Sequence, residues 1–181
     1  MLDAITLGAR EVQVTPTAAV ALERLYVAHR DAVLRYLRAI SPGEDEAMDL
    51  AAAVFERAFA VVARDPSVDL GLPWLLRTAR NAAIDQGRRR KVRQVHLAGM
   101  APSAGFVPGP EPGYLERERD AALRAALAQL PEPAKDAIAL RYGLGLSAKE
   151  IGPIIGKGEA ATQKLIVRGL ARLREVLDAR P

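Results

Sequence analysis

Apolar residues recur every three or four positions over long stretches of this 181-residue chain, on both sides of a segment rich in proline and glycine. This spacing places them on one face of a helix, whereas a half-buried strand would need alternation. It predicts seven helices, at residues 17–40, 44–63, 74–93, 116–130, 132–142, 147–155 and 159–177. No stretch predicts a strand. The pattern indicates an all-α protein.

Turn-forming residues divide these helices into two groups. Eight glycines and prolines crowd residues 99–113, a composition typical of a flexible linker rather than a packed element. Thr17 is a candidate cap for the first helix, and Pro73 suits the first turn of the third. We therefore expect a flexible lead-in at 1–16, a helical domain at 17–95, a linker at 96–115 and a second helical domain at 116–181.

Composition and charge remove several function classes. The chain has no cysteine, so disulfides, thiolate metal sites and cysteine nucleophiles are excluded. It shows neither a glycine-rich phosphate loop nor a His-Glu-x-x-His motif, and His29 and His96 are far apart in sequence. We expect no enzyme activity, no cofactor and no metal. With no signal-peptide pattern and no apolar run of membrane-spanning length, we expect a cytoplasmic protein without membrane insertion.

The positive charge is concentrated on the third predicted helix. Residues 64–93 contain eight basic and three acidic side chains, a local charge of +5 against +4 for the whole chain. One helical face carries Arg77, Arg80, Asn81, Ile84, Arg88 and Lys91. Four consecutive cations at 88–91 exceed what capping of a helix end requires, and they suit a phosphate backbone. The alternative is a solvated, charged helix end.

The second half has the layout of a helix-turn-helix. Residues 147–150 form a predicted capping box, in which Ser147 and Glu150 satisfy each other's backbone N–H groups. Gly156 then supplies a sharp turn before a longer helix. On that helix Thr162, Leu165, Ile166, Leu170, Leu173 and Leu177 are expected to face the core. The opposite arc carries Ala160, Gln163, Lys164, Val167, Arg168 and Arg174, and its early members would enter the major groove of DNA. An ordinary amphipathic helix with a solvated face is the alternative.

Two stretches resemble a known family. The run from Trp74 to Asp85, followed by three arginines at 88–90, resembles the promoter-melting region of extracytoplasmic-function sigma factors. The run from Leu130 to Arg141, followed by residues 145–147 and 150–151, resembles their C-terminal promoter-binding domain. The resemblance covers roughly residues 20–93 and 116–178. It implies a sigma factor that directs RNA polymerase to promoters, with two helical domains on a flexible linker.

The resemblance also implies roles for particular residues. The minus-ten element would be held as single strand, with one base flipped into the loop at 65–71 and Trp74 supporting that loop. The implied minus-ten set is Asp65, Ser67, Asp69, Arg77, Arg80, Asn81, Arg88, Arg89, Arg90 and Lys91. The implied minus-thirty-five set is Lys157, Ala160, Gln163, Lys164, Val167 and Arg168. The set implied for core polymerase is Asp49, Leu50, Ala53, Phe55 and Glu56.

The implied partners are promoter DNA, core RNA polymerase, through the clamp helices of its large subunit and its flap, and an anti-sigma factor. The chain departs from the family at two sites: Ala53 stands where an acidic residue is usual, and residues 162–165 differ from the usual reading-helix sequence. Pro153 lies inside the short helix before the turn, where it removes a backbone hydrogen bond. Two alternatives therefore stay open: a sigma-like decoy that binds an anti-sigma factor, and a helix-turn-helix regulator without polymerase contact.

Overall fold

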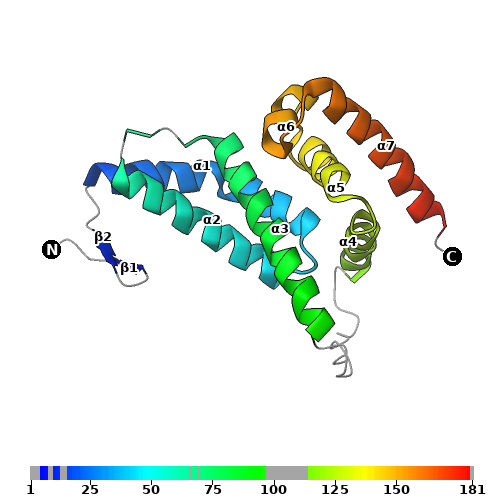
Figure 1. Cartoon of the computed structure of the whole chain (residues 1–181), viewed down its shortest axis with the longest axis horizontal. Helices are drawn as coiled ribbons and strands as arrows, with labels where there is room; N and C mark the ends of the chain where they lie inside the picture. Colours follow the sequence, from blue (N-terminus) through cyan, green and yellow to red (C-terminus); the bar gives the residue numbers. More distant parts are fainter. Residues whose placement is uncertain are drawn as a thin grey trace.

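The computed structural model describes residues 5–7, 10–12, 16–65, 67–68, 70–96 and 114–179. Seven α-helices and one π-helical turn make up nearly all of this part of the chain (Figure 1). In chain order the elements are β1 (Ile5–Leu7), β2 (Arg10–Val12), α1 (Pro16–Ile40), α2 (Glu44–Arg64), α3 (Leu72–His96), α4 (Tyr114–Leu127), α5 (Glu132–Ile138), η1 (Ala139–Gly143), α6 (Ala148–Ile155) and α7 (Glu159–Asp178). The predicted all-α class and the seven helices are confirmed.

The N-terminal hairpin is a correction to the expected lead-in without strands. Strands β1 and β2 pair antiparallel, with Ile5 opposite Val12 and Leu7 opposite Arg10. Two residues, Gly8 and Ala9, separate the strands in sequence, and glycine first in a two-residue connection is typical of a hairpin. Strands of three residues are too short to show the alternation by which a strand is recognised.

Helices α1, α2 and α3 form the N-terminal bundle. Its fully buried side chains include Val33 and Leu37 from α1, Val54 from α2, and Leu75 and Leu76 from α3. Acidic residues occupy the first turn of α2, where the helix dipole favours negative charge, and one of them, Glu44, accepts a 2.8 Å hydrogen bond from Arg38 Nε. The bundle fixes α3 along its whole first half and leaves its basic end at the surface.

Element ends differ from the predicted ones for local reasons. Helix α1 begins at Pro16, so Thr17 lies inside the helix rather than capping it. Helix α3 extends to His96, and α4 ends at Leu127, before the turn that leads into Pro131. A proline disfavours helical geometry in the residue before it, here Leu130, so α4 does not continue into Pro131. The predicted linker at 96–115 lies almost entirely outside the described residues.

The two halves of the chain pack directly against each other. Helix α3 contacts α6, and α1 contacts η1 and α4. Leu75 and Leu76 of α3 belong to the same continuous apolar cluster as Ile151, Ile154 and Ile155 of α6. Figure 1 shows the C-terminal helices alongside α1 and α3. The helical pattern alone did not predict this packing, because it identifies buried faces but not the faces they meet.

Candidate nucleic-acid interface

The basic side chains of α3 fall into two groups. Arg77, Arg88, Arg89, Lys91 and Arg93 are exposed. Arg80 and Arg90 are instead held by acids: Arg80 Nε donates to Asp136 Oδ2 at 2.6 Å, and Arg90 Nη1 donates to Glu46 Oε2 at 2.6 Å. The charges of the exposed group are therefore available to a partner. Among the described residues, Arg88 is the one member of this group near an acid, since its Nη1 lies 3.9 Å from Asp85 Oδ1, at the limit of an ion pair.

The loop before α3 is described in part. Asp65 Oδ1 accepts a 3.0 Å hydrogen bond from the backbone N–H of Ser67. The Ser67 hydroxyl and then its N–H hold the pKa of the Asp65 carboxyl below its usual value, so this carboxylate stays charged. Both side chains are exposed. Asp69, the third predicted member of the loop, lies outside the described residues. Trp74 is half-buried against the core of the N-terminal bundle.

A groove of about 370 Å³ runs between α2 and α3. Asn81 and Arg89 line it from α3, and Asp49 and Ala53 line it from α2. The structure therefore brings two residues of the predicted minus-ten set, Asn81 and Arg89, beside the predicted polymerase-binding helix. Because Ala53 stands where an acidic residue is usual in the family, the α2 side of this groove carries one negative charge fewer than the family pattern would give it.

The predicted polymerase-binding set on α2 needs a correction. Asp49, Ala53 and Glu56 are exposed on one face, but Leu50 and Phe55 are buried in the bundle. The ring of Phe55 lies edge-on to Tyr26 of α1, with 4.9 Å between ring centroids. In a 3.6-residue repeat, Leu50 and Phe55 fall on the packing face. Their side chains pack in the bundle and hold α2 in place, so the part of the predicted set that is exposed for a partner is Asp49, Ala53 and Glu56.

The helix-turn-helix has the geometry that its sequence predicts. Ser147 Oγ accepts from the N–H of Glu150 at 3.3 Å, and Glu150 Oε2 accepts from the N–H of Ser147 at 2.8 Å, which completes the capping box. Helix α6 continues through Pro153, which is exposed, and ends at Ile155; Gly156 caps it in the left-handed conformation, with φ of 70°. Only glycine adopts that conformation without strain. The turn is therefore fixed by local chemistry.

Helix α7 presents its predicted reading face to solvent. All six members of the predicted minus-thirty-five set are exposed, namely Lys157, Ala160, Gln163, Lys164, Val167 and Arg168. On the other side Thr162, Ile166 and Leu173 are buried, and Leu165 and Leu170 are half-buried. Leu177, in the last turn of α7, is the exception, since its side chain is 38% exposed.

Sequence reasoning missed two residues at the boundary between the halves. The Tyr36 hydroxyl donates to Asp136 Oδ1 at 2.9 Å, while Arg80 donates to the other carboxylate oxygen. Burial raises the pKa of the Asp136 carboxyl, an effect that the Arg80 charge opposes, and burial raises the pKa of Tyr36. The signal available in the sequence was Asp136 followed directly by the apolar residues 137–140, since an acid on a packing face needs a partner when buried.

Comparisons with known proteins agree with this geometry. The family model of sigma-70 region 2 matches residues 25–93, and that of sigma-70 region 4 matches residues 120–173. The chain belongs to the extracytoplasmic-function group of the sigma-70 family. The two matched regions coincide with the α1–α3 bundle and with helices α4–α7.

The sequence of this sigma factor aligns with those of similar proteins over different shares of their length. It is 31% identical over 154 residues to the ECF RNA polymerase sigma factor SigE of Mycolicibacterium smegmatis, covering 82% of this chain and 58% of that protein. It is 27% identical over 184 residues to the probable RNA polymerase sigma factor RfaY of Xanthomonas campestris, covering 97% of this chain and 46% of that protein. The chain thus spans about half the length of these two relatives. Identity to the ECF sigma factor SigM of Bacillus subtilis is 25% over 157 residues, with 87% and 95% covered.

Solved structures show the same fold. The sigma factor RpoE of Bartonella quintana, in complex with the anti-sigma factor NepR, aligns with a TM-score of 0.68 at 21% identity, covering 88% of this chain and 98% of that one. CnrH in complex with the cytosolic domain of CnrY aligns with a TM-score of 0.64 at 23% identity, covering 91% and 97%. Among the described helices of this sigma factor, none has the length and apolarity to cross a membrane.

The capping box of this sigma factor gives a prediction for stability and pH. The Ser147 hydroxyl and then its N–H hold the pKa of Glu150 below its usual value. A carboxyl with a lowered folded-state pKa stabilises the fold above its unfolded-state pKa, and this contribution is lost as the pH falls through the folded value. We expect Ser147→Ala to cost about 1 kcal/mol of unfolding free energy, the usual value of an N-cap serine.

The measurement is urea unfolding at neutral and acidic pH, with NMR titration of Glu150 alongside. In the Ser147→Ala variant the pKa of Glu150 should move back toward its usual value. A wild-type Glu150 that titrates at the usual value, or a variant as stable as wild type, contradicts the role of the box.

Proposed function

We propose that this protein directs core RNA polymerase to promoters in the bacterial cytoplasm and opens the DNA at the minus-ten element, acting by binding rather than by catalysis. One observation carries the proposal: a single chain presents two separate exposed faces suited to DNA. The first is the cationic end of α3, with Arg88, Arg89 and Lys91, and the second is the reading face of α7.

At the minus-ten element, the exposed cations of α3 would hold the backbone of a single strand. Lys and Arg neutralise phosphates and release counterions, and this gives affinity without base specificity. Extruding a base costs a few kcal/mol, so a receptive loop beside the basic helix is needed to offset it. Asp65 and Ser67 in the loop, with exposed Asn81 on α3, are the proposed contacts with bases.

At the minus-thirty-five element, α7 would lie in the major groove with its N-terminal turns against the bases. Gln163 can pair with the edge of an adenine, and Lys164 can reach guanine or phosphate. Arg168 lies one turn further along and suits the backbone. The buried side of α7, with Ile166 and Leu173, keeps the helix rigidly seated while its other face reads DNA.

The exposed face of α2, with Asp49, Ala53 and Glu56, is proposed to bind the clamp helices of the polymerase large subunit, and the C-terminal half to bind the flap. An anti-sigma factor is a further proposed partner, since both aligned structures hold a sigma factor with such a protein or with the cytosolic domain of a partner. The exposed charges on α2 suit a complementary basic or mixed surface.

Transcription in a purified system tests the proposal. The chain is added to core polymerase with a pool of DNA carrying random minus-thirty-five and minus-ten segments at a fixed spacing. We expect transcripts to arise from templates that share a common motif, and only when the chain is present. Undetectable binding to core polymerase together with the absence of any enriched motif would falsify the proposal.

The acid missing at residue 53 gives a separate prediction. Ala53→Glu places a carboxylate on the exposed face of α2, four residues before Arg57, an arrangement that a helix tolerates well. We expect core polymerase to bind this variant more tightly, by roughly fivefold, which corresponds to about 1 kcal/mol for one complementary charge. Ala52→Glu, also exposed on α2, serves as the positional control. Equal affinities of both variants and wild type in a titration with labelled core polymerase contradict the assignment.

The same alanine favours a second candidate function, a decoy that binds an anti-sigma factor without working with polymerase. Weak contact with core polymerase would suit a decoy, but a decoy does not need the exposed cations Arg88, Arg89 and Lys91. The two functions separate in the transcription assay: a decoy relieves inhibition of another sigma factor but yields no transcripts of its own. The region 2 match opposes a simple helix-turn-helix regulator, since such a regulator needs no such domain.

A further inference from the structure

A cleft of about 830 Å³ is lined by α3, by the loop that follows α1, and by helices α4 and α5. Its volume lies within the range of roughly 300–1,000 Å³ that is usual for sites of small molecules. On α3 the lining residues follow one helical stripe, namely Arg80, Ile84, Gly87 and Lys91. On α4 they do the same, at Ala121, Arg124, Ala125 and Ala128. Each helix therefore turns one face toward the cleft.

Basic side chains outnumber acidic ones in this cleft by six to three, which leaves a charge of +3. Two of the acids are already engaged, since Asp136 accepts from Arg80 and Glu46 accepts from Arg90, both at 2.6 Å. Among the described residues, none of the other four lining cations forms an ion pair with an acid of the cleft, namely Arg88, Lys91, Arg124 and Lys135. The excess positive charge is therefore available to an anion.

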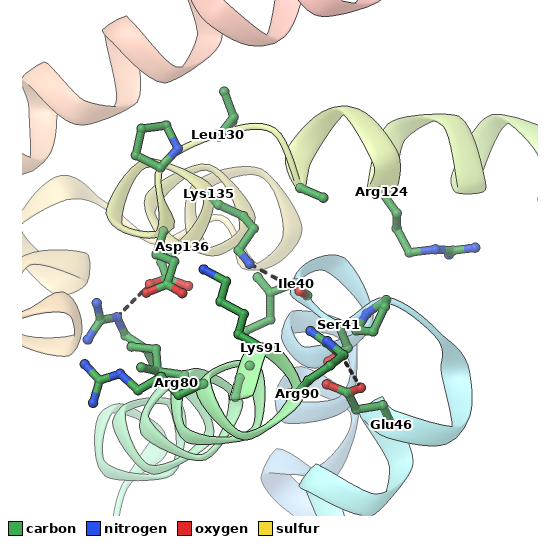
Figure 2. A pocket seen from close by; sticks show the side chains of 18 of the residues that line it. Ile40, Ser41, Glu46, Arg80, Arg90, Lys91, Arg124, Leu130, Lys135 and Asp136 are labelled. Atoms are coloured by element: carbon green, nitrogen blue, oxygen red, sulfur yellow. Dashed lines mark hydrogen bonds and ion pairs between the residues drawn. The ribbon is translucent and has the colours of Figure 1, made fainter. Parts of the chain in front are cut away.

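Two of these cations enter the cleft from opposite walls. Figure 2 shows Lys91 extending from α3 and Lys135 extending from α5 into the same space. Lys135 Nζ donates to the carbonyl oxygen of Ile40 at 3.4 Å, a long contact that leaves two of its three protons for another acceptor. Lys91 has no hydrogen-bond partner in the part of the chain that the structure describes. Like charges repel each other across an empty space, whereas a multiply charged anion between them attracts both.

Much of the remaining lining is apolar. It includes Ile40, Ala83, Ile84, Ala125, Ala128 and Leu130, which we call the apolar wall. A Cβ added to Gly87 would meet no heavy atom within 4 Å, so the space beside this part of α3 is open. The buried hydroxyl of Ser41, which also lines the cleft, has no hydrogen-bond partner among the described residues and can donate to a ligand oxygen. Cations beside an apolar wall suit a molecule with phosphates at one end and a ring at the other.

We propose that this cleft binds a nucleotide carrying two or more phosphates, with the phosphates between Lys91 and Lys135 and the base against the apolar wall. Phosphate oxygens accept strong, charge-assisted hydrogen bonds from ammonium groups. Lysine makes such contacts as a compact charge on a flexible stem, which suits a phosphate chain that has several conformations. This binding does not depend on the proposed function in transcription.

Calorimetric titration of the full-length chain in magnesium-free buffer tests the ligand class. The probes are ATP, ADP, inorganic tripolyphosphate and adenosine. We expect one ATP or ADP per chain, tripolyphosphate binding roughly tenfold weaker than ATP because it has no ring to bury, and no detectable binding of adenosine. Tripolyphosphate that binds as tightly as ATP removes the role of the apolar wall and overturns the assignment of a nucleotide. Undetectable binding of ATP overturns the proposal outright.

Substitutions test the position of the site. Lys91→Gln and Lys135→Gln should each weaken ATP binding roughly tenfold, because each removes one charge-assisted contact. Lys149→Gln, exposed on α6 and outside the cleft, is the matched control and should bind ATP like wild type.

A second pair of substitutions tests the space rather than the charge. Gly87→Leu fills the cleft without changing its charge and should abolish ATP binding, whereas Ala28→Leu, exposed on α1 and outside the cleft, should not. Circular dichroism verifies that every variant keeps its helices. Equal losses in Lys149→Gln and Lys91→Gln, or full ATP binding in Gly87→Leu, overturn the proposed site.

The site shares cations with the proposed minus-ten set, since Arg88 and Lys91 belong to both. Bound nucleotide should therefore compete with a DNA strand, a consequence that rests on the proposed function. With ATP at ten times its Kd, the apparent Kd of a labelled single-stranded 30-mer should rise roughly tenfold in wild type. In Lys135→Gln, which lies outside the minus-ten set and binds ATP more weakly, the same ATP concentration should raise it only about twofold.

The outcomes of the competition are distinct. An equal rise in Lys135→Gln would be an effect of ionic strength and overturns the competition, as does an unchanged Kd in wild type. The proposed function fails separately, through absent promoter-specific transcription in a protein that still binds ATP.

Discussion

Replacing Arg88, Arg89 and Lys91 together with glutamine is expected to abolish promoter opening while leaving the fold intact. These three side chains are exposed, and none has an ion pair closer than the 3.9 Å contact of Arg88 with Asp85. Three phosphate contacts at roughly 1 kcal/mol each multiply to at least a hundredfold loss of affinity for single-stranded DNA. The slope of log K against log salt should fall by about 2, because each contact on a single strand contributes about 0.7.

Two controls make this result specific. Glutamine at Arg24, Arg30 and Arg172, which are exposed and outside both proposed DNA faces, removes the same charge and should reduce binding only slightly. Arg90→Gln should affect DNA binding less than any member of the triple variant, because Arg90 is engaged with Glu46. The readouts are anisotropy of a labelled oligonucleotide and permanganate footprinting of the melted region with core polymerase. A triple variant that melts DNA like wild type contradicts the assignment of α3.

Gly152→Ala is expected to destabilise the helix-turn-helix by about 2 kcal/mol, although alanine normally favours a helix. A Cβ at residue 152 would stand 2.6 Å from the carbonyl oxygen of Lys157, a backbone atom that cannot move aside cheaply. The Lys157 N–H also donates to the Gly152 carbonyl at 2.8 Å, which fixes the turn against α6. Overpacking costs up to about 3 kcal/mol, and the helix preference of alanine returns about 1.

The same substitution at Gly87 should change the free energy of unfolding in the opposite direction. Gly87 lies inside α3 with nothing within 4 Å of an added Cβ, so alanine there gains helix preference without a clash. We expect Gly87→Ala to raise the free energy of unfolding by up to about 1 kcal/mol. Thermal unfolding followed by circular dichroism separates the two variants. We expect the midpoint of Gly152→Ala to lie roughly 10 °C below that of Gly87→Ala. A neutral Gly152→Ala would show that the turn can shift.

Sequence reasoning succeeded where structure depends on neighbours along the chain. The capping box at 147–150 and the left-handed Gly156 follow from hydrogen bonds and backbone sterics within a few residues, so their sequence signals are direct. The reading face of α7 followed from the 3.6-residue repeat alone. The same repeat places Leu50 and Phe55 in the bundle, where the structure finds them buried, whereas the family resemblance implied that they contact a partner.

Tertiary structure decided which cations are available. The sequence shows a stripe of similar arginines on α3, yet Arg80 is bound to Asp136, 56 residues away in sequence, and Arg90 to Glu46, 44 residues away. No local pattern predicts such pairs, because they depend on how helices pack. The sequence by itself therefore determined the helices, the turn and the family. Only the packing of the two halves decided that Arg80 is withheld, since a buried charge requires a partner that comes from another element.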